Sequence, residues 1–200
     1  MLPGYAFKSE LFSENSADVR LLRGANVGVG SLKWDDVVYW SLDNSIDIEA
    51  FALHDGDIVF GMDRPWINAG ARAAIVRPED LPCYLVQRVS RIRAKLNVNQ
   101  KYVYYALVSE EFKVHAEADL TGLGVPHISP DQIKSFLIPA PNKEEQDLIV
   151  ANIEQSTFRI DKIVEEVEHS ITLALEHRTA LISAAVTGKI DVRTCKEKTA

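Results

Sequence analysis

Hydrophobic and polar residues follow two different patterns along the chain, and the change comes near Pro141. Before Pro141, short apolar runs alternate with Gly, Asn, Asp and Pro, which is typical of strands joined by turns. The runs are residues 19–22, 36–40, 57–61 and 73–77. Residues 99–116 instead place apolar side chains at helical spacing, so we expect one helix there. The first 141 residues are therefore predicted to form an α+β domain that is mostly strands.

Residues 142–186 contain neither Pro nor Gly and predict one long helix. Asn142 stands three residues before Glu145, a spacing that caps a helix N-terminus, and Gly188 supplies a C-terminal stop. An unbroken helix of about 45 residues would span ~65 Å at 1.5 Å per residue. The alternative is a helix that breaks into two and folds back on the first domain, because helices this long are rare.

An apolar stripe runs along this predicted helix and keeps coiled-coil spacing in its first half. Later steps of four residues depart from the strict heptad, as stutters do. A stripe this long needs a second helix to cover it, so we predict a coiled coil. The predicted dimerisation residues are Ile149, Ile153, Ile160, Ile163, Val167, Ile171, Leu175 and Ile182.

Composition and charge narrow the possible classes of protein. With 46% hydrophobic and 26% charged residues, the chain has enough apolar residues for a core. A net charge of −7 argues against a protein that binds nucleic acid over its whole surface, but it is compatible with a local basic surface. Cys83 and Cys195 lack CxxC spacing, which excludes a disulfide framework and a cysteine zinc site. Since no apolar run reaches ~18 residues and no leader is present, we expect no membrane span and a cytoplasmic protein.

Catalytic motifs are incomplete in this sequence. Thr187-Gly188-Lys189 lacks the first glycine and the final Ser or Thr of a P-loop, and neither GxSxG nor HExxH occurs. Asp55 and Asp57 are paired carboxylates that could bind a metal or act as an acid–base pair. An Asp-Gly-Asp sequence before an apolar run is also a turn that enters a strand. We favour the turn and expect no enzymatic activity and no cofactor in this chain; a metal-dependent hydrolase is the alternative.

Nine short segments, taken in order, match one protein family over nearly the whole chain. They include GYAFKSELF at 4–12, LHDGDIVFGM at 53–62, TGLGVPHIS at 121–129, IPAPNKEEQDLI at 138–149 and RTALISAAVTGKIDV at 178–192. The set resembles the specificity (S) subunits of type I restriction-modification enzymes. No single segment is specific, whereas the combination of IPxPxxxEQ, a long helix and AVTGKI is distinctive.

The resemblance implies a target recognition domain at residues 1–141 that binds double-stranded DNA. It implies a spacer helix at 142–193 that dimerises and docks a modification subunit; residues 194–200 are expected to be a disordered tail. Family members carry two such units, and their spacer helices pair antiparallel. Methylation of adenine with S-adenosylmethionine belongs to the modification (methyltransferase) subunit, and ATP- and Mg-dependent cleavage belongs to the restriction subunit.

This chain has one such unit, so it is expected to be either a natural half subunit or a fragment. It would then work as an antiparallel homodimer or together with a second S protein. In either case the resemblance implies that it recognises DNA and leaves the chemistry to its partners.

Basic side chains gather where the sequence predicts loops and one acid-free stretch, Leu81 to Ser109. Arginines two or three apart at a sheet edge can meet successive phosphates, while Arg and Lys can bond guanine and Asn can bond adenine. The candidate DNA-binding residues are Arg23, Asn26, Lys33, Arg64, Asn68, Arg72, Arg88, Arg91, Arg93, Lys95, Thr121 and His127. The alternatives are an ordinary solvated surface and a coiled-coil adaptor that binds protein without DNA specificity. A steep dependence on salt would favour DNA binding.

Overall fold

A computed structural model describes residues 1–41, 47–118 and 126–190 of the chain. The chain divides into two compact units, Met1–Ile149 and Val150–Ala200, which are described separately. The candidate Thr121 and the predicted tail at 194–200 lie outside the described residues.

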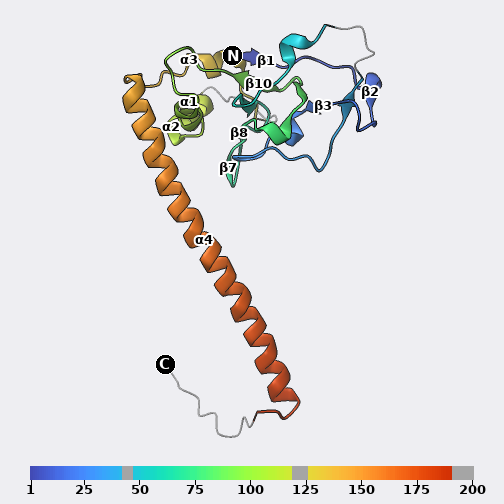
Figure 1. The fold of residues 1–200 in the computed structure, drawn as a ribbon, viewed down its shortest axis with the longest axis vertical. Coiled ribbons are helices and arrows are strands. Elements are labelled where there is room, and N and C mark those ends of the chain that lie inside the picture. Colours follow the sequence, from blue (N-terminus) through green and yellow to red (C-terminus); the bar gives the residue numbers. More distant parts are fainter. Residues whose placement is uncertain (42–46, 119–125, 191–200) are drawn as a thin grey trace. The chain divides into compact units, whose positions relative to one another are not determined.

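Two four-stranded sheets form the framework of the first unit (Figure 1). The first sheet is antiparallel and has the order β1 (Leu2–Pro3), β10 (Val89–Ile92), β5 (Ile58–Gly61), β8 (Ala73–Ile75). The second has the order β2 (Phe12–Ser13), β4 (Tyr39–Trp40), β3 (Val19–Leu22), β9 (Cys83–Leu85), and only β3 and β9 run parallel. A hairpin of β6 (Trp66–Ile67) and β7 (Gly70–Ala71) stands apart from both sheets. Four 3-10 turns connect strands: η1 (Ser9–Leu11), η2 (Gly24–Asn26), η3 (Glu49–Phe51) and η4 (Pro78–Asp80). All four predicted runs contain strands, although β4 and β8 are shorter than expected.

The described part of the first unit also contains three short helices: α1 (Gln100–Leu107), α2 (Glu110–Glu117) and α3 (Pro130–Ser135). The prediction of a single helix over 99–116 is wrong. Val108 leaves the helical conformation, with φ −101° and ψ 2°, and the Ser109 hydroxyl then accepts a hydrogen bond from the Phe112 amide. Ser is a strong N-cap, so the chain begins a second helix at a position where apolar spacing alone indicates continuation.

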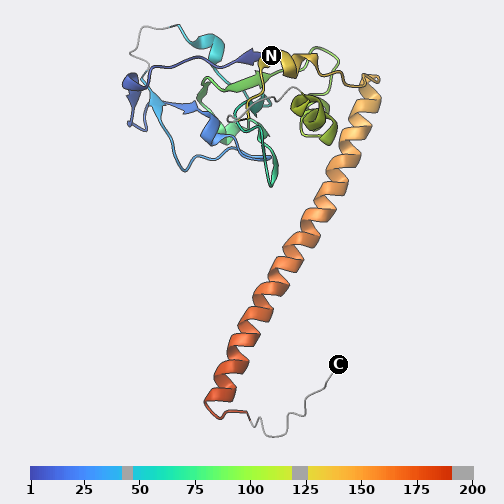
Figure 2. The same cartoon turned by 180° about the vertical axis from the view of Figure 1, so that it is seen from behind.

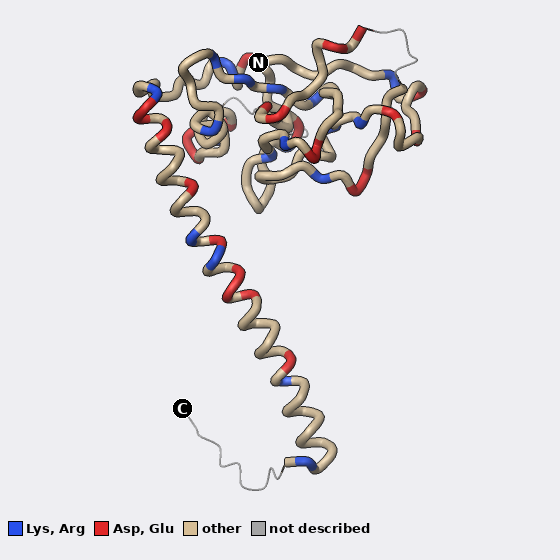
Figure 3. The backbone as a smooth tube through the Cα atoms, in the orientation of Figure 1, with Lys and Arg blue, Asp and Glu red and all other residues tan. Residues whose placement is uncertain are grey.

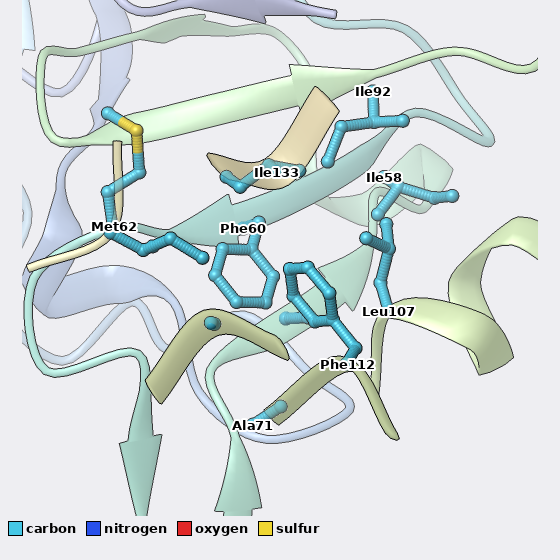
Figure 4. Close-up of a cluster of buried hydrophobic side chains, with 11 residues drawn as sticks. Ile58, Phe60, Met62, Ala71, Ile92, Leu107, Phe112 and Ile133 are labelled. Atoms are coloured by element: carbon cyan, nitrogen blue, oxygen red, sulfur yellow. The ribbon is translucent and has the colours of Figure 1, made fainter. Parts of the chain in front are cut away.

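All four residues of β5, Ile58–Gly61, are buried. Side chains alternate between the two faces of a strand, so both faces of β5 are covered, as expected for a central strand. Ile58 and Phe60 pack with Leu107, Phe112 and Ile133 of the helices (Figure 4), and the Phe60 and Phe112 rings meet edge-on at 5.6 Å. Val59 points the other way and packs in a cluster that includes Leu22 and Leu85 of the second sheet. The first sheet is therefore a middle layer between the helices and the second sheet.

The long helix α4 (Lys143–Val186) is 44 residues and unbroken (Figure 2). The Asn142 side chain accepts a hydrogen bond from the Glu145 amide at 2.8 Å, and Gly188 adopts φ +73° after the last turn. Both ends therefore lie where the sequence predicts, and a helix of this length measures roughly 65 Å. The alternative of two shorter helices is wrong, and the α+β prediction is confirmed. Within the described residues, no helix is long and apolar enough to cross a membrane.

Candidate nucleic-acid interface

An open hollow of about 770 Å³ brings together side chains from four distant parts of the first unit. It is lined by Gly24, Ala25, Asp63, Arg64, Ile67, Arg72, Arg88 and His127. Four of the predicted DNA-binding residues, three arginines and His127, therefore lie on one surface. The lining also includes an acidic residue, Asp63, that the sequence analysis does not single out.

Asp63 holds the other polar residues of the hollow in place. Its carboxylate Oδ1 lies 2.6 Å from Nδ1 of His127 and 3.4 Å from Nη1 of Arg88. Since a carboxylate can only accept, the hydrogen of the His127 contact belongs to Nδ1. The backbone aligns these residues because the Arg64 amide donates to Pro126 O and the Ile128 amide donates to Met62 O. A segment more than 60 residues away thus closes one side of the hollow.

Arg64 and Arg88 both have left-handed backbones, with φ of +43° and +69°. This conformation is uncommon for residues other than Gly, Asn and Asp, and each instance costs on the order of 1–3 kcal/mol unless the surroundings hold it. Among the described residues, the third non-glycine case is Asn97, which tolerates the conformation well. Two strained arginines that line the same hollow are typical of a functional site.

The Arg72 side chain lines the hollow and links the loop 24–33 to the backbone at Asp63. Its Nε donates to Val27 O at 3.1 Å, its Nη1 donates to Asp63 O at 2.9 Å, and its Nη2 donates to Gly24 O. Burial, and then the repulsion of Arg64, lower the pKa of the Arg72 guanidinium from its ordinary value. Three of the five N–H groups of Arg72 are therefore committed to the scaffold.

Asn26 has a structural role instead of the predicted base contact. Its side chain is 1% exposed, and its amide donates to Lys33 O and Asp36 O at 2.9 and 2.8 Å. Its Oδ1 accepts from the Arg23 amide. Because both ends of the amide are used inside the protein, Asn26 shapes the loop 24–33 and has no free edge for a base. Arg23 supports the same loop through Asp36, with its Nη2 2.9 Å from the carboxylate.

Lys33 and Asn68 are exposed on two loops that contribute residues to the hollow. The loop 24–33 supplies Gly24 and Ala25, and Asn68 lies between β6 and β7, next to Ile67. The two loops touch, because a Cβ atom at Gly70 would lie 3.3 Å from Val29 Cγ1. Neither residue lines the hollow, and both remain candidates on the loops beside it.

The predicted row of arginines at a sheet edge is wrong, because β1 pairs with β10 and covers it. Arg91 donates from Nη1 to Ala50 O and Ala52 O, at 3.1 and 3.0 Å. Arg93 pairs with Asp57, with Nη2 2.8 Å from Oδ2. Only Arg88, which precedes β10, lines the hollow, while Lys95 is exposed beyond the end of the strand.

The Asp55–Asp57 pair forms a turn, as the favoured interpretation predicts. Asp57 is 3% exposed, and its Oδ2 accepts a hydrogen bond from the His54 amide at 2.8 Å. Its carboxylate is therefore occupied by the turn and by Arg93. In the part of the chain that the structure describes, no three His, Cys, Asp or Glu residues are placed to hold a metal ion.

The second unit exposes an apolar stripe on α4. Six predicted dimerisation residues are about half exposed: Ile160, Ile163, Val167, Ile171, Leu175 and Ile182. Ile149 and Ile153, at the start of the helix, are partly buried. The exposed Val164 and Leu181 widen the stripe, whereas the exposed Phe158 and Leu173 lie on the opposite face of the helix; the sequence analysis singles out none of the four. Charged residues are sparse toward the C-terminal end of α4 (Figure 3), so this end is the more apolar one.

The fold and the hollow define a class of protein: a module with a β-sheet scaffold, a hollow lined by basic residues and a long helix with an exposed apolar stripe. The family model described as the type I restriction modification DNA specificity domain matches residues 18–172. The chain therefore belongs to the type I restriction-modification DNA specificity family, which confirms the resemblance read from its motifs.

Two type I restriction enzyme specificity subunits are similar to this chain over almost all of its length. The type I restriction enzyme EcoAI specificity subunit of Escherichia coli is 35% identical over 185 residues, which cover 92% of this chain and 31% of that protein. The MjaVIII specificity subunit of Methanocaldococcus jannaschii is 29% identical and covers 95% of this chain and 44% of that protein. This chain thus spans less than half the length of either relative.

Solved structures show the same fold at low identity. A chain from a study of complex assembly and conformational transition of the type I R-M system has a TM-score of 0.69 at 15% identity, over 92% of this chain and 42% of that one. The HsdS subunit from Thermoanaerobacter tengcongensis has a TM-score of 0.55 at 17% identity, over 80% of this chain and 35% of that one.

Proposed function

We propose that this chain is a non-catalytic DNA-recognition module of a type I restriction-modification complex. The observation that carries the proposal is the hollow, where three arginines and one histidine from distant segments meet in a member of a DNA specificity family. Partner subunits would bind S-adenosylmethionine, ATP and Mg, methylate adenine and cleave DNA. This chain would direct both activities to one sequence.

The hollow concentrates positive charge in a protein whose net charge is −7. A local basic surface can attract DNA even when the rest of the protein repels it. Arg64 is exposed in the hollow, and Lys33 and Asn68 are exposed on loops that contribute lining residues; contacts from them to phosphates would orient the duplex. Base edges would then enter the hollow itself.

The exposed stripe supports assembly through α4. We propose an antiparallel homodimer, with a second S protein as the other possible occupant. A two-fold pair carries two identical recognition domains, so its target would be a palindromic site split by a fixed gap. A modification subunit would dock on the paired helices.

Salt-dependent DNA binding tests the proposal against a protein-binding adaptor. Affinity of the full chain for a mixed-sequence duplex should fall steeply as salt rises, measured by fluorescence anisotropy. Arg64→Gly, which suits the left-handed backbone, should weaken binding and reduce the log–log salt slope by about 0.9 for one lost phosphate contact. Arg77→Ala removes an exposed arginine outside the hollow and is the control. No binding by the wild-type chain would overturn the proposal.

Methylation mapping tests the proposed role in the complex. The full chain, co-purified with a modification subunit, should direct adenine methylation to one defined sequence. Methylation without sequence preference, or no co-purification with such a subunit, would contradict it.

A further inference from the structure

We infer that the hollow reads a G·C base pair: Arg88 contacts guanine, and Asp63 positions Arg88 and accepts a hydrogen bond from the cytosine amino group. This inference rests on the proposed function, because it assigns the ligand of the same surface.

The pair of groups in the hollow matches the chemistry of a G·C edge. In the major groove guanine presents two acceptors, N7 and O6, and cytosine presents an amino donor, N4. Arg88 offers two parallel donors, and the neighbouring Asp63 carboxylate, 3.4 Å from Nη1 of Arg88, can only accept. An A·T pair lacks the two adjacent acceptors that a guanidinium binds as a fork.

Asp63 also argues against a phosphate at Arg88. A phosphate group carries only acceptors and a negative charge, and so does the carboxylate beside Arg88. A phosphate bound to Arg88 would lie close to the Asp63 carboxylate. The two anions would repel each other, because neither carries a hydrogen to share. A base edge next to Arg88 avoids that repulsion and gives Asp63 a donor.

Arg88 is held in position before any DNA arrives. Its backbone is left-handed, its guanidinium contacts Asp63, and Asp63 is itself held by His127 at 2.6 Å. Arg72 binds the carbonyl oxygen of Asp63 from below, at 2.9 Å. The Arg88 side chain still remains 58% exposed. A pre-positioned side chain loses less conformational entropy on binding, which favours discrimination between bases.

Selection from a duplex library with a randomised segment tests the inference on the full chain. The wild type should select a sequence with at least one strongly preferred G·C position. Arg88→Gln replaces the two parallel N–H donors of the guanidinium with an amide, which matches the edge of adenine and not that of guanine. It should abolish the preference at that one position, a change of about 5- to 150-fold in relative affinity, and leave other positions unchanged. Asp63→Asn should reduce preference at the same position, because the carboxylate no longer fixes the guanidinium.

A second variant and a modified base separate base reading from a folding defect. Arg88→Gly fits the left-handed backbone and should lose the same preference while its thermal unfolding midpoint stays at or above that of the wild type. Replacing the selected guanine with 7-deazaguanine removes the N7 acceptor and should weaken wild-type binding but not that of Arg88→Gly. A wild type that binds with no sequence preference would contradict the proposed function itself. An Arg88→Gln variant that selects the same G·C position would overturn only this inference.

Discussion

Replacing Ile160 and Ile163 with Glu should separate the α4 pair into monomers. The two side chains are 58% and 59% exposed in the single chain, so pairing removes more than half of each from water. Complete burial of an Ile side chain contributes about 1.5–3 kcal/mol. The exposed share of four such side chains, two from each protomer, therefore contributes roughly 3.5–7 kcal/mol to the dimer.

A loss of this size weakens association several hundredfold or more, since each ~1.4 kcal/mol is a factor of ten in the dissociation constant. Burial of four carboxylates would add to the effect. Sedimentation velocity at micromolar concentration should show twice 22.3 kDa for the wild type and 22.3 kDa for the double variant. In the monomeric double variant, the helicity of α4 depends on its N-cap and its packing alone. Circular dichroism measures how much of the helix remains.

Lys162→Glu is the matched control, because it changes the net charge of the chain by the same −2 without removing an apolar side chain. It should remain dimeric. A double variant that stays dimeric would refute the argument that the apolar stripe drives pairing. A wild type that is monomeric at micromolar concentration with α4 still helical would rule out the homodimer and leave a second S protein as partner.

Three further changes test other parts of the structure. Asp57→Ala removes a buried carboxylate that accepts the His54 amide and pairs with Arg93, and should lower the free energy of unfolding by about 2 kcal/mol in urea; an unchanged value would show that the pair contributes nothing. Asn142→Ala deletes the cap of α4 and should cost about 1 kcal/mol, seen as a lower thermal midpoint, whereas Asn142→Ser should largely retain it. Burial raises the pKa of the Cys83 thiol to about 12, so the folded state resists its ionisation. The unfolding free energy should therefore be intact below about pH 9 and fall as pH rises toward 12, by up to ~1.4 kcal/mol per unit, and Cys83→Ala should remove this part of the decline.

Local signals in the sequence predict α4 almost completely. A run without Pro or Gly, the Asn142 cap and Gly188 are each short-range features, and each acts within one helical turn. The same short-range reasoning fails at Ser109, because apolar spacing continues through the break between α1 and α2. There the cap residue decides the structure, and spacing does not reveal it.

The hollow could be predicted only in part, because its geometry depends on long-range pairing. Arg64, Arg88 and His127 are recognisable as basic residues in loops, but Asp63 becomes visible only when residues 126–128 pair with 62–64. Strand order likewise decides that β10 is covered by β1, so that Arg91 bonds the backbone at Ala52 and Arg93 pairs with Asp57. No local pattern distinguishes these arginines from Arg88.

Because the backbones of Arg64 and Arg88 are left-handed, thermal stability and the proposed DNA recognition favour different residues at these positions. Glycine at either position would fit the backbone without strain, so a search for heat-resistant variants should favour glycine there. Each such variant would remove a basic group from the hollow. A laboratory population selected only for survival at high temperature should therefore lose these arginines early, while one also required to recognise its site should keep them. The residues found at positions 64 and 88 would therefore show whether a population was selected for thermal stability alone or also for recognition of its site.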